Sequence, residues 1–363
     1  PENSSVAITQ TGGMCRATNY VGMLRRALKA AGYPQVPVLS LSLQGFDSNP
    51  GFKLTPAMLH RIIQSLVIGD TLQRVLLRTR PYERRAGSAN ELYRRWDAIT
   101  QEWFAHRHYS PTLGKRLSYR GLLTKLVAEF DALPLVDVPR KPRIGIVGEI
   151  LVKFQPDANN NVVGVVEAEG CEAVLPNLAE FFTYSLAAAD WRLENLGSGS
   201  KLGVRLQQAM VWVFERYERP ASRAFAKTKG KFAISPSIYK LRDYAQKVIS
   251  IGTDAGEGWF MVGEMIELIE QGVPNIICCQ PFACLPNHVI GRGMFKELRA
   301  QHPEANIVSI DYDPGAPEVN QLNRIKLMVA TAFKNAHLRP TPNWDTPAQP
   351  FQLETQIRTE IRT

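Results

Sequence analysis

Four of the five cysteines in this chain fall in two short segments that lie far apart in the sequence. One cysteine belongs to Thr11-Gly-Gly-Met-Cys-Arg-Ala-Thr-Asn19, and three belong to Asn275-Ile-Ile-Cys-Cys-Gln-Pro-Phe-Ala-Cys-Leu-Pro-Asn-His288. In both segments an apolar β run meets a turn, which is where α/β proteins build their sites. Thiolates gathered there are soft ligands, so we expect a soft metal and, first among these, an iron–sulfur cluster. The spacing matches no standard zinc or ferredoxin signature.

The first segment places a thiol at the predicted start of a helix. Cys15 follows Gly12 and Gly13, and free amide N–H groups and the helix dipole would favour its thiolate. The two glycines would let a bulky ligand approach the backbone, so we predict that they bind a cofactor. The alternative is a buried structural cysteine, which is common.

In the second segment the three cysteines have different expected roles. Cys278 ends an apolar strand, and Cys284 lies in the turn after it, beyond a proline that cannot continue a regular ladder. Cys279 should point opposite to Cys278 because side chains alternate along a strand, so we assign Cys279 to the core. Cys171, the fifth cysteine, enters another predicted strand and is assigned to the core as well.

His288 is a candidate catalytic group, since it could hydrogen-bond a substrate or tune a sulfur. A surface loop histidine is the equal alternative. A zinc site built from Cys15, Cys278, Cys284 and His288 is a further possibility.

Two glycine–glutamate turns are candidate ligand loops. Gly148 and Glu149 follow a predicted strand, whereas Gly256, Glu257 and Gly258 precede a predicted helix. The glycines are therefore predicted to bind a cofactor, and the two carboxylates are candidate catalytic groups.

Three other patterns are assigned to ordinary structure. The stretch 197–201 lacks the glycine before lysine and the preceding strand of a P-loop, so no ATP site is expected there. The acidic run 311–313 with its Pro-Gly reads as a turn. A basic stretch over residues 216–231 forms a solvated face or, as the sharper alternative, contacts the phosphates of coenzyme A.

The composition is that of a globular protein long enough for two domains: 363 residues, 45% hydrophobic and 21% charged. Five scattered cysteines favour a reducing cytoplasm over a secreted disulfide scaffold. No apolar run of about 18 residues occurs, so no membrane partner is expected. The net charge is +9, but the basic residues form no nucleic-acid motif, so no nucleic-acid partner is expected. Because the first residue is Pro1, we interpret the chain as a fragment or a processed product.

The periodicity of apolar residues predicts an α/β fold with two Rossmann/flavodoxin-like parallel-sheet domains and added helices. The predicted domains are residues 1–139, with a helical extension, and 140–337, followed by a tail over 338–363. Strands are predicted at 6–9, 36–42, 143–147, 173–176, 275–278 and 306–310. Helices are predicted at 17–31, over most of 56–130, and at 160–169, 200–218, 235–250, 259–271, 291–300 and 318–334.

Several long strings together resemble one protein family. These are Gln10-Thr-Gly-Gly-Met-Cys-Arg-Ala-Thr-Asn-Tyr20, Ile146-Val-Gly-Glu-Ile150, the segment from Cys278 to His288, and Ile310-Asp-Tyr-Asp-Pro-Gly-Ala-Pro-Glu-Val-Asn-Gln-Leu-Asn-Arg324. The chain looks like the C-terminal module of the large CoA-substrate-specific enzyme activases, which is similar to the D-component of 2-hydroxyglutaryl-CoA dehydratase. The resemblance covers most of the chain.

The resemblance implies a [4Fe–4S] cluster held by three cysteines, which by position are Cys15, Cys278 and Cys284. It also implies an ATP-dependent activator domain or subunit as electron donor, a CoA thioester as substrate, and a possible homodimer. The nucleotide-binding motifs of the activator and the middle cysteine motif of the dehydratases are absent from this chain. Whether the module dehydrates a substrate or only relays electrons therefore stays open, and a cluster-free scaffold for the activator is the rival interpretation.

Overall fold

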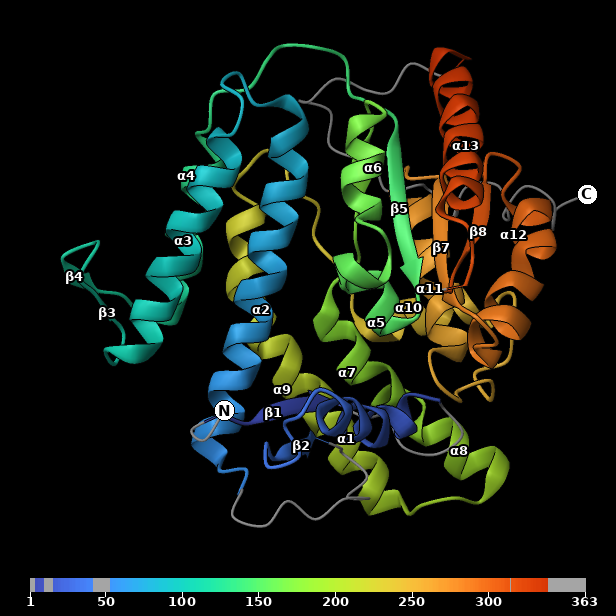
Figure 1. The fold of residues 1–363 in the computed structure, drawn as a ribbon, viewed down its shortest axis with the longest axis horizontal. Coiled ribbons are helices and arrows are strands. Elements are labelled where there is room, and N and C mark those ends of the chain that lie inside the picture. The colour runs from blue at the N-terminus through green and yellow to red at the C-terminus, as the bar shows by residue number, and fades with distance from the viewer. Residues whose placement is uncertain (1–3, 10–15, 42–52, 314, 339–363) are drawn as a thin grey trace, which may run out of the picture.

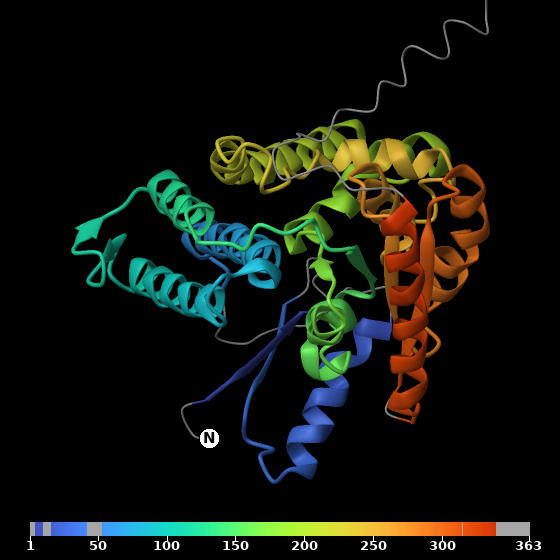
Figure 2. The same ribbon diagram turned by 90° about the horizontal axis from the view of Figure 1, so that it is seen from above.

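The computed structural model describes residues 4–9, 16–41, 53–313 and 315–338. The predictions for Gly12, Gly13 and Cys15, and for all but the first residue of the predicted tail, lie outside these residues. Two parallel sheets, one short antiparallel hairpin and a set of helices make up the described part (Figures 1 and 2). This arrangement confirms the predicted α/β class.

The smaller parallel sheet belongs to an N-terminal β-α-β unit. Strands β1 (Val6–Thr9) and β2 (Val38–Leu41) pair in parallel, and α1 (Tyr20–Ala30) connects them. A parallel pair needs such a crossover, because the chain must return to the same end of the sheet. The sequence predicted all three elements.

The larger sheet has four parallel strands in the order β6-β5-β7-β8. Their bounds are β5 (Arg143–Gly148), β6 (Glu172–Val174), β7 (Asn275–Pro281) and β8 (Asn306–Tyr312). The strands β5 and β7 are buried along almost their whole length, as expected for a parallel sheet covered on both faces.

Helices cover both faces of the larger sheet. One face packs against α5 (Ile150–Phe154), α6 (Val162–Ala168) and α13 (Glu318–Leu338). The other face packs against α11 (Gly258–Glu270) and α12 (Phe295–Gln301). A strand in the middle of this sandwich must be apolar on both sides, which explains the continuous run Ile276-Ile-Cys-Cys279.

A helical block lies beside the sheet (Figure 2). It contains α2 (Pro56–Thr79), α3 (Ser88–Ala105), α4 (Tyr119–Asp131) and α9 (Lys201–Phe225), which share one apolar core. The side chain of Thr55 caps α2 by accepting a hydrogen bond from the Met58 amide at 3.2 Å, as its position before Pro56 predicts. Because α9 follows the sheet strand β6 in the chain, this core combines residues from both sides of the predicted boundary at 139.

The remaining elements are short helices and one hairpin. The helices are α7 (Leu178–Ala187), α8 (Ala189–Leu196) and α10 (Ile238–Gln246), and the hairpin strands are β3 (Tyr109–Ser110) and β4 (Lys115–Arg116). Among the described residues, no helix combines the length and apolar character that a bilayer crossing requires.

A buried ion cluster, the Glu172 cluster, fastens the helical block to the sheet. Glu172 on β6 accepts hydrogen bonds from Arg78 at 3.0 Å, from Tyr82 at 2.7 Å and from Arg140 at 2.7 and 3.1 Å. Burial alone would raise the pKa of Glu172, but the charges of Arg140 and Arg78 outweigh it and hold that pKa below its ordinary value. The carboxylate is therefore ionised and fully compensated.

Candidate functional site

The strand order of the larger sheet defines a switch point between β5 and β7. The chain leaves β5 toward β6 on one side and returns to β7 on the other, with α6 on one face and α11 on the opposite face. Crevices at the carboxyl ends of strands form where the topology reverses in this way. In Figure 1 these carboxyl ends point toward the N-terminal unit, so this edge is the candidate functional site.

The predicted ligand glycines lie at this edge, where backbones approach closely. A Cβ on Gly148, whose φ is +127°, would come within 2.0 Å of the carbonyl oxygen of Cys279. A Cβ on Gly256 would meet Pro286 at 2.7 Å, and one on Gly258 would meet the carbonyl of Thr253 at 1.7 Å. These contacts explain why glycine stands at each position, and cofactor binding by the three glycines stays a prediction.

Two of the predicted sulfur ligands are joined by a pair of buried amides, which we call the amide bridge. Gln280 Nε2 donates to the carbonyl oxygen of Asn287 at 2.9 Å and contacts Cys278 Sγ at 3.6 Å. Asn287 Nδ2 donates to Cys284 Sγ at 3.1 Å. Each sulfur thus faces one amide donor, and the two amides are themselves connected.

The turn that carries Cys284 is held in an uncommon backbone conformation. Ala283 has a φ of +57°, a left-handed value that non-glycine residues rarely adopt. A π-helical turn follows over Pro286–Gly291. The amide of His288 in this turn donates a hydrogen bond to the carbonyl oxygen of Cys284 at 2.9 Å. Conformations of both kinds concentrate at functional sites.

Both thiols are shielded from water. Cys278 is 0% exposed and contacts the Met261 sulfur at 3.7 Å, whereas Cys284 is 6% exposed. Burial raises the pKa of Cys278 to about 12 and that of Cys284 to about 11, and hydrogen bonds from the amide bridge oppose this rise. The sulfurs are therefore neutral thiols unless a cation stabilises their thiolates.

The other two described cysteines belong to the core, as predicted. Cys279 and Cys171 are fully buried in the apolar cluster on the face of the sheet opposite to Cys278. The alternation along β7 separates the neighbouring sulfurs. Burial raises the pKa of Cys171 to about 11.

The two candidate catalytic glutamates, Glu149 and Glu257, both accept hydrogen bonds from backbone amides at the start of α5. Glu149 caps α5 by accepting from the Val152 amide at 2.9 Å, and it also accepts from the Tyr20 hydroxyl at 3.5 Å. Glu257 accepts from the Ile150 amide at 3.2 Å, and its other oxygen is buried with no partner among the described residues. Burial and the nearby charge of Glu257 raise the pKa of Glu149 to about 7. Burial also raises the pKa of Glu257.

Both ring nitrogens of His288 face oxygen atoms. Nδ1 lies 2.9 Å from the Cys284 carbonyl, and Nε2 lies 3.2 Å from the carboxylate of Asp311 at the end of β8. A zinc ligand needs a free nitrogen lone pair, so His288 would have to break one of these contacts to bind the metal. Of the acidic run predicted as a turn, Asp311 and Tyr312 belong to β8, and Asp313 accepts a hydrogen bond from the Gly315 amide at 3.0 Å.

The described residues supply part of the predicted ligand set. They contain no group of three or more His, Cys, Asp or Glu side chains arranged to hold a metal ion. The strand β7 continues to Pro281, so Cys278 lies inside the strand and not at its end as predicted, whereas Cys284 lies in the turn beyond it. The sulfurs of both residues face amide donors, which fits sulfur ligation of a cluster. The predicted third ligand, Cys15, lies outside the described residues.

Sequence reasoning missed the two amides and Tyr20. Gln280 and Asn287 are polar residues inside otherwise apolar or proline-bounded stretches, and such a position is the signal that could have found them. No local signal connects Tyr20 to Glu149, because the two lie on different units. Comparison with known proteins returned no match to any family model, curated protein or solved structure.

Proposed function

We propose that this chain is the iron–sulfur module of a system like the 2-hydroxyacyl-CoA dehydratases and their activases. It would carry out low-potential electron transfer or the reductive dehydration of a CoA thioester in the cytoplasm of an anaerobic cell. One observation supports this best: the sulfurs of Cys278 and Cys284 are joined by the amide bridge at the switch point of a parallel sheet.

Cys278, Cys284 and Cys15 would hold the cluster, and a bound [4Fe–4S] cluster would supply one-electron chemistry at low potential. The amide bridge orients its N–H groups toward both sulfurs, which stabilises negative charge there and so favours the reduced state. Burial of the two thiols has the opposite effect, since a low dielectric disfavours added charge. The balance of these two effects would set the potential.

Glu149 and Glu257 would act as general acid and base at the same edge of the sheet. A carboxyl with a pKa of about 7 holds and releases a proton at neutral pH, which is what general acid–base catalysis requires. Tyr20 orients the Glu149 carboxyl and thereby involves the N-terminal unit in the site.

The partners are part of the proposal. An exposed apolar rim of Phe282, Leu285 and Val289, which are 66%, 67% and 59% exposed, surrounds the Cys284 turn and suits the docking of an electron-donating activator. The exposed arginines of the 216–231 stretch would hold the phosphates of coenzyme A. Formation of a homodimer is expected by resemblance alone.

A cluster-free scaffold for the activator is the second candidate. The full burial of Cys278 against Met261 favours it, because a packed cysteine needs no metal to explain it. In that case the chain would support the activator domain without redox chemistry of its own.

Anaerobic reconstitution with iron and sulfide separates the two candidates. We expect the chain to turn brown and to bind iron and sulfide in equal amounts, and we expect Cys284→Ala, Cys278→Ala and Cys15→Ala to lose most of both. Cys279→Ala is the matched control, because Cys279 follows Cys278 in the sequence but its side chain packs on the opposite face of the sheet. Full iron content in Cys15→Ala and Cys284→Ala, or zinc without sulfide, would overturn the proposal.

A further inference from the structure

Seven buried or half-buried carboxyl groups form a series through the interior of the molecule, which we call the carboxyl line. From the helical block to the sheet edge its members are Asp70, Glu218, Glu180, Glu267, Glu264, Glu257 and Glu149. Only Glu149 and Glu257 belong to the site described above. The other five have no role in the proposed chemistry so far.

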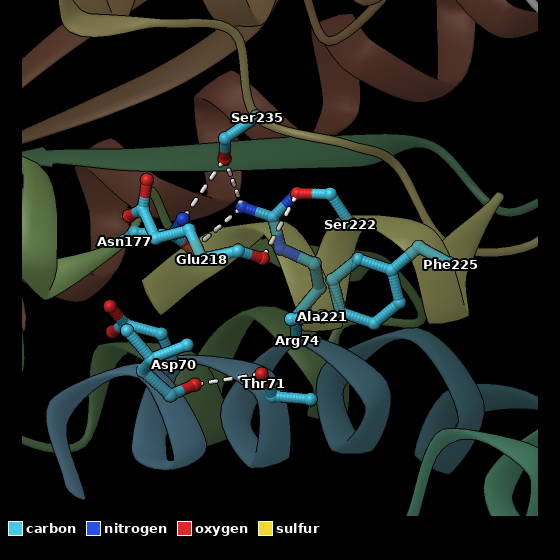
Figure 3. Close-up of a pocket in the computed structure, with 10 residues that line it drawn as sticks. Asp70, Thr71, Arg74, Asn177, Glu218, Ala221, Ser222, Phe225 and Ser235 are labelled. Atoms are coloured by element: carbon cyan, nitrogen blue, oxygen red, sulfur yellow. Dashed lines mark hydrogen bonds between the residues drawn. The ribbon is translucent and has the colours of Figure 1, made fainter. Parts of the chain in front are cut away.

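The outer end of the carboxyl line borders a small polar cavity between α2 and α9. Asp70 and Glu218 line it together with Arg74, Asn177 and Ser235, and the polar groups of the last three point toward one another (Figure 3). Its volume of about 30 Å³ has room for at least one water molecule. Glu218 is only partly buried, so this end reaches solvent.

The middle of the carboxyl line is Glu180 on α7. It is 5% exposed, and neither of its carboxyl oxygens has a hydrogen-bond partner among the described residues. The ring of Tyr184 stacks on Phe260 with centroids 5.1 Å apart, so α7 packs directly on α11. A buried carboxyl without partners is costly unless it holds a proton or binds water.

The inner half follows one side of α11. Glu257, Glu264 and Glu267 are spaced seven and three residues apart, which places them on one side of the helix. Glu264 pairs with Lys153 at 2.8 Å through one oxygen, and its other oxygen has no partner within the described chain. The helix thus extends the series from α7 to the turn that contains Cys284.

Burial is the main cause of the raised pKa of every member. For five members a neighbouring carboxyl raises the pKa further: Asp70 acts on Glu218, Glu267 and Glu218 act on Glu180, Glu264 acts on Glu267, and Glu257 acts on both Glu264 and Glu149. The charged groups that face Glu180 are Glu267 and Glu264 from α11, Glu218 from α9 and Arg74 from α2.

We propose that the carboxyl line, with water molecules taken up between its members, conducts protons between the cavity at Asp70 and Glu218 and the sheet edge at Glu257 and Glu149. In each transfer one carboxyl oxygen accepts a proton while the O–H bond on the other oxygen breaks and passes its proton onward. Every carboxyl ends as it began, no electrons move, and the net change is one proton carried from solvent to the site or back.

This inference rests on the proposed function and sharpens it. A module that only relays electrons needs no proton path. Removal of a hydroxyl group as water takes up one proton at the site, and the C–H bond broken in the same turnover returns one. The two protons cancel over a full turnover, so the path would reset the protonation of Glu149 and Glu257 between these steps. A proton path therefore favours reductive dehydration over electron relay alone.

Infrared spectroscopy of the metal-free chain provides the test. The carbonyl stretch of the buried protonated carboxyls is followed after transfer into D₂O. In Glu180→Gln, which keeps shape but cannot pass a proton, the remaining inner carboxyls should exchange about a hundredfold more slowly than in the wild type. Glu270→Gln, at the exposed last residue of α11, is the matched control and should leave the exchange rate unchanged.

Equal exchange rates in Glu180→Gln and the wild type would overturn the inference, as would the absence of any protonated carboxyl at neutral pH. If Glu180→Gln does not fold, Glu267→Gln interrupts the same series, and its exchange rate is compared with that of the wild type in the same way. Iron and sulfide content of the reconstituted chain is measured alongside. Blocked exchange in a chain that binds no iron would uphold the proton path and reject the proposed function, whereas normal exchange in an iron-loaded Glu180→Gln chain would do the reverse.

Discussion

The Glu172 cluster and the carboxyl line are two groups of buried charge that the protein treats in opposite ways. Glu172 receives hydrogen bonds from two arginines and a tyrosine, and its pKa is lowered. Glu180, on the next helix, receives none among the described residues, and burial together with the charge of Glu267 raises its pKa well above the ordinary value. A compensated carboxylate fastens elements together, whereas an uncompensated one keeps its proton and can exchange it.

The difference follows from what surrounds each group. The Glu172 cluster lies where the helical block meets the sheet, and it is bounded by Arg78 and Arg140. Along the carboxyl line, the seven acids face Arg74 and Lys153 as the main cations. Such an imbalance is unfavourable for stability, so we interpret it as a sign of function.

The largest expected effect is at the Glu172 cluster. Glu172→Gln removes the carboxylate that compensates Arg78 and Arg140, and we expect it to lower the free energy of unfolding by about 3–5 kcal/mol. Urea unfolding at pH 7 measures this. The partly exposed pair of Arg80 and Glu167, whose side chains are 24% and 17% exposed, is the control, and Glu167→Gln should cost about 1 kcal/mol or less. Equal costs for the two variants would contradict the assigned role.

Lys153 and Glu264 form an intermediate case, because they are a single buried pair inside the carboxyl line. Lys153→Met leaves Glu264 without its cation, and we expect a loss of about 3 kcal/mol at pH 8. Because burial raises the pKa of Glu264, the carboxylate is more readily protonated as the pH falls, so the loss should be smaller at pH 5. Adding Glu264→Gln to this variant should restore most of the loss. A double-mutant cycle at both pH values checks this, and a loss independent of pH would speak against it.

Glu267 tests whether a carboxyl group of the carboxyl line keeps its proton near neutral pH. Its pKa rises from 4.5 to about 7 because of burial, so the folded state binds the proton more tightly than the unfolded state does. Wild-type stability should therefore fall as the pH rises between these two values, and Glu267→Gln should abolish that fall. Relative to the wild type, the variant should gain about 2–3 kcal/mol between pH 4.5 and pH 8. Parallel stability curves for the two proteins would exclude a protonated Glu267.

The smallest expected effect is at the outer end of the carboxyl line. Asp70 accepts hydrogen bonds from the Leu178 and Ala179 amides at 2.8 and 2.9 Å and so caps α7 from a neighbouring helix. Asp70→Asn keeps one acceptor, so we expect a loss of about 1 kcal/mol in thermal unfolding. Because burial raises the pKa of Asp70 to about 6, the folded wild type binds a proton there more tightly than the unfolded chain does, and its stability falls as the pH rises through this range. The loss caused by Asp70→Asn should therefore be smaller at pH 8 than at pH 5. A cost that does not depend on pH would contradict a raised pKa of Asp70.

Much of the fold was predictable because its signals are local. Apolar runs predicted every strand of the larger sheet, and Thr55-Pro56 predicted the start of α2. The helices α7 and α8 and the β3–β4 hairpin were not predicted. Glu180 is buried on α7, where polar and apolar residues are mixed, and the sequence pattern alone does not predict that a second helix covers it. Gln280 and Asn287 were missed as site residues because their importance depends on the geometry of one turn.

The sequence by itself determined where strands and helices lie and which way Cys278 and Cys279 point, because backbone periodicity is a property of neighbouring residues. Only the tertiary structure decided which buried carboxylates meet arginines and which meet one another. The partners of Glu172 and Glu180 come from helices far away in the chain, and the pKa of a buried group depends on those partners and on its distance from water.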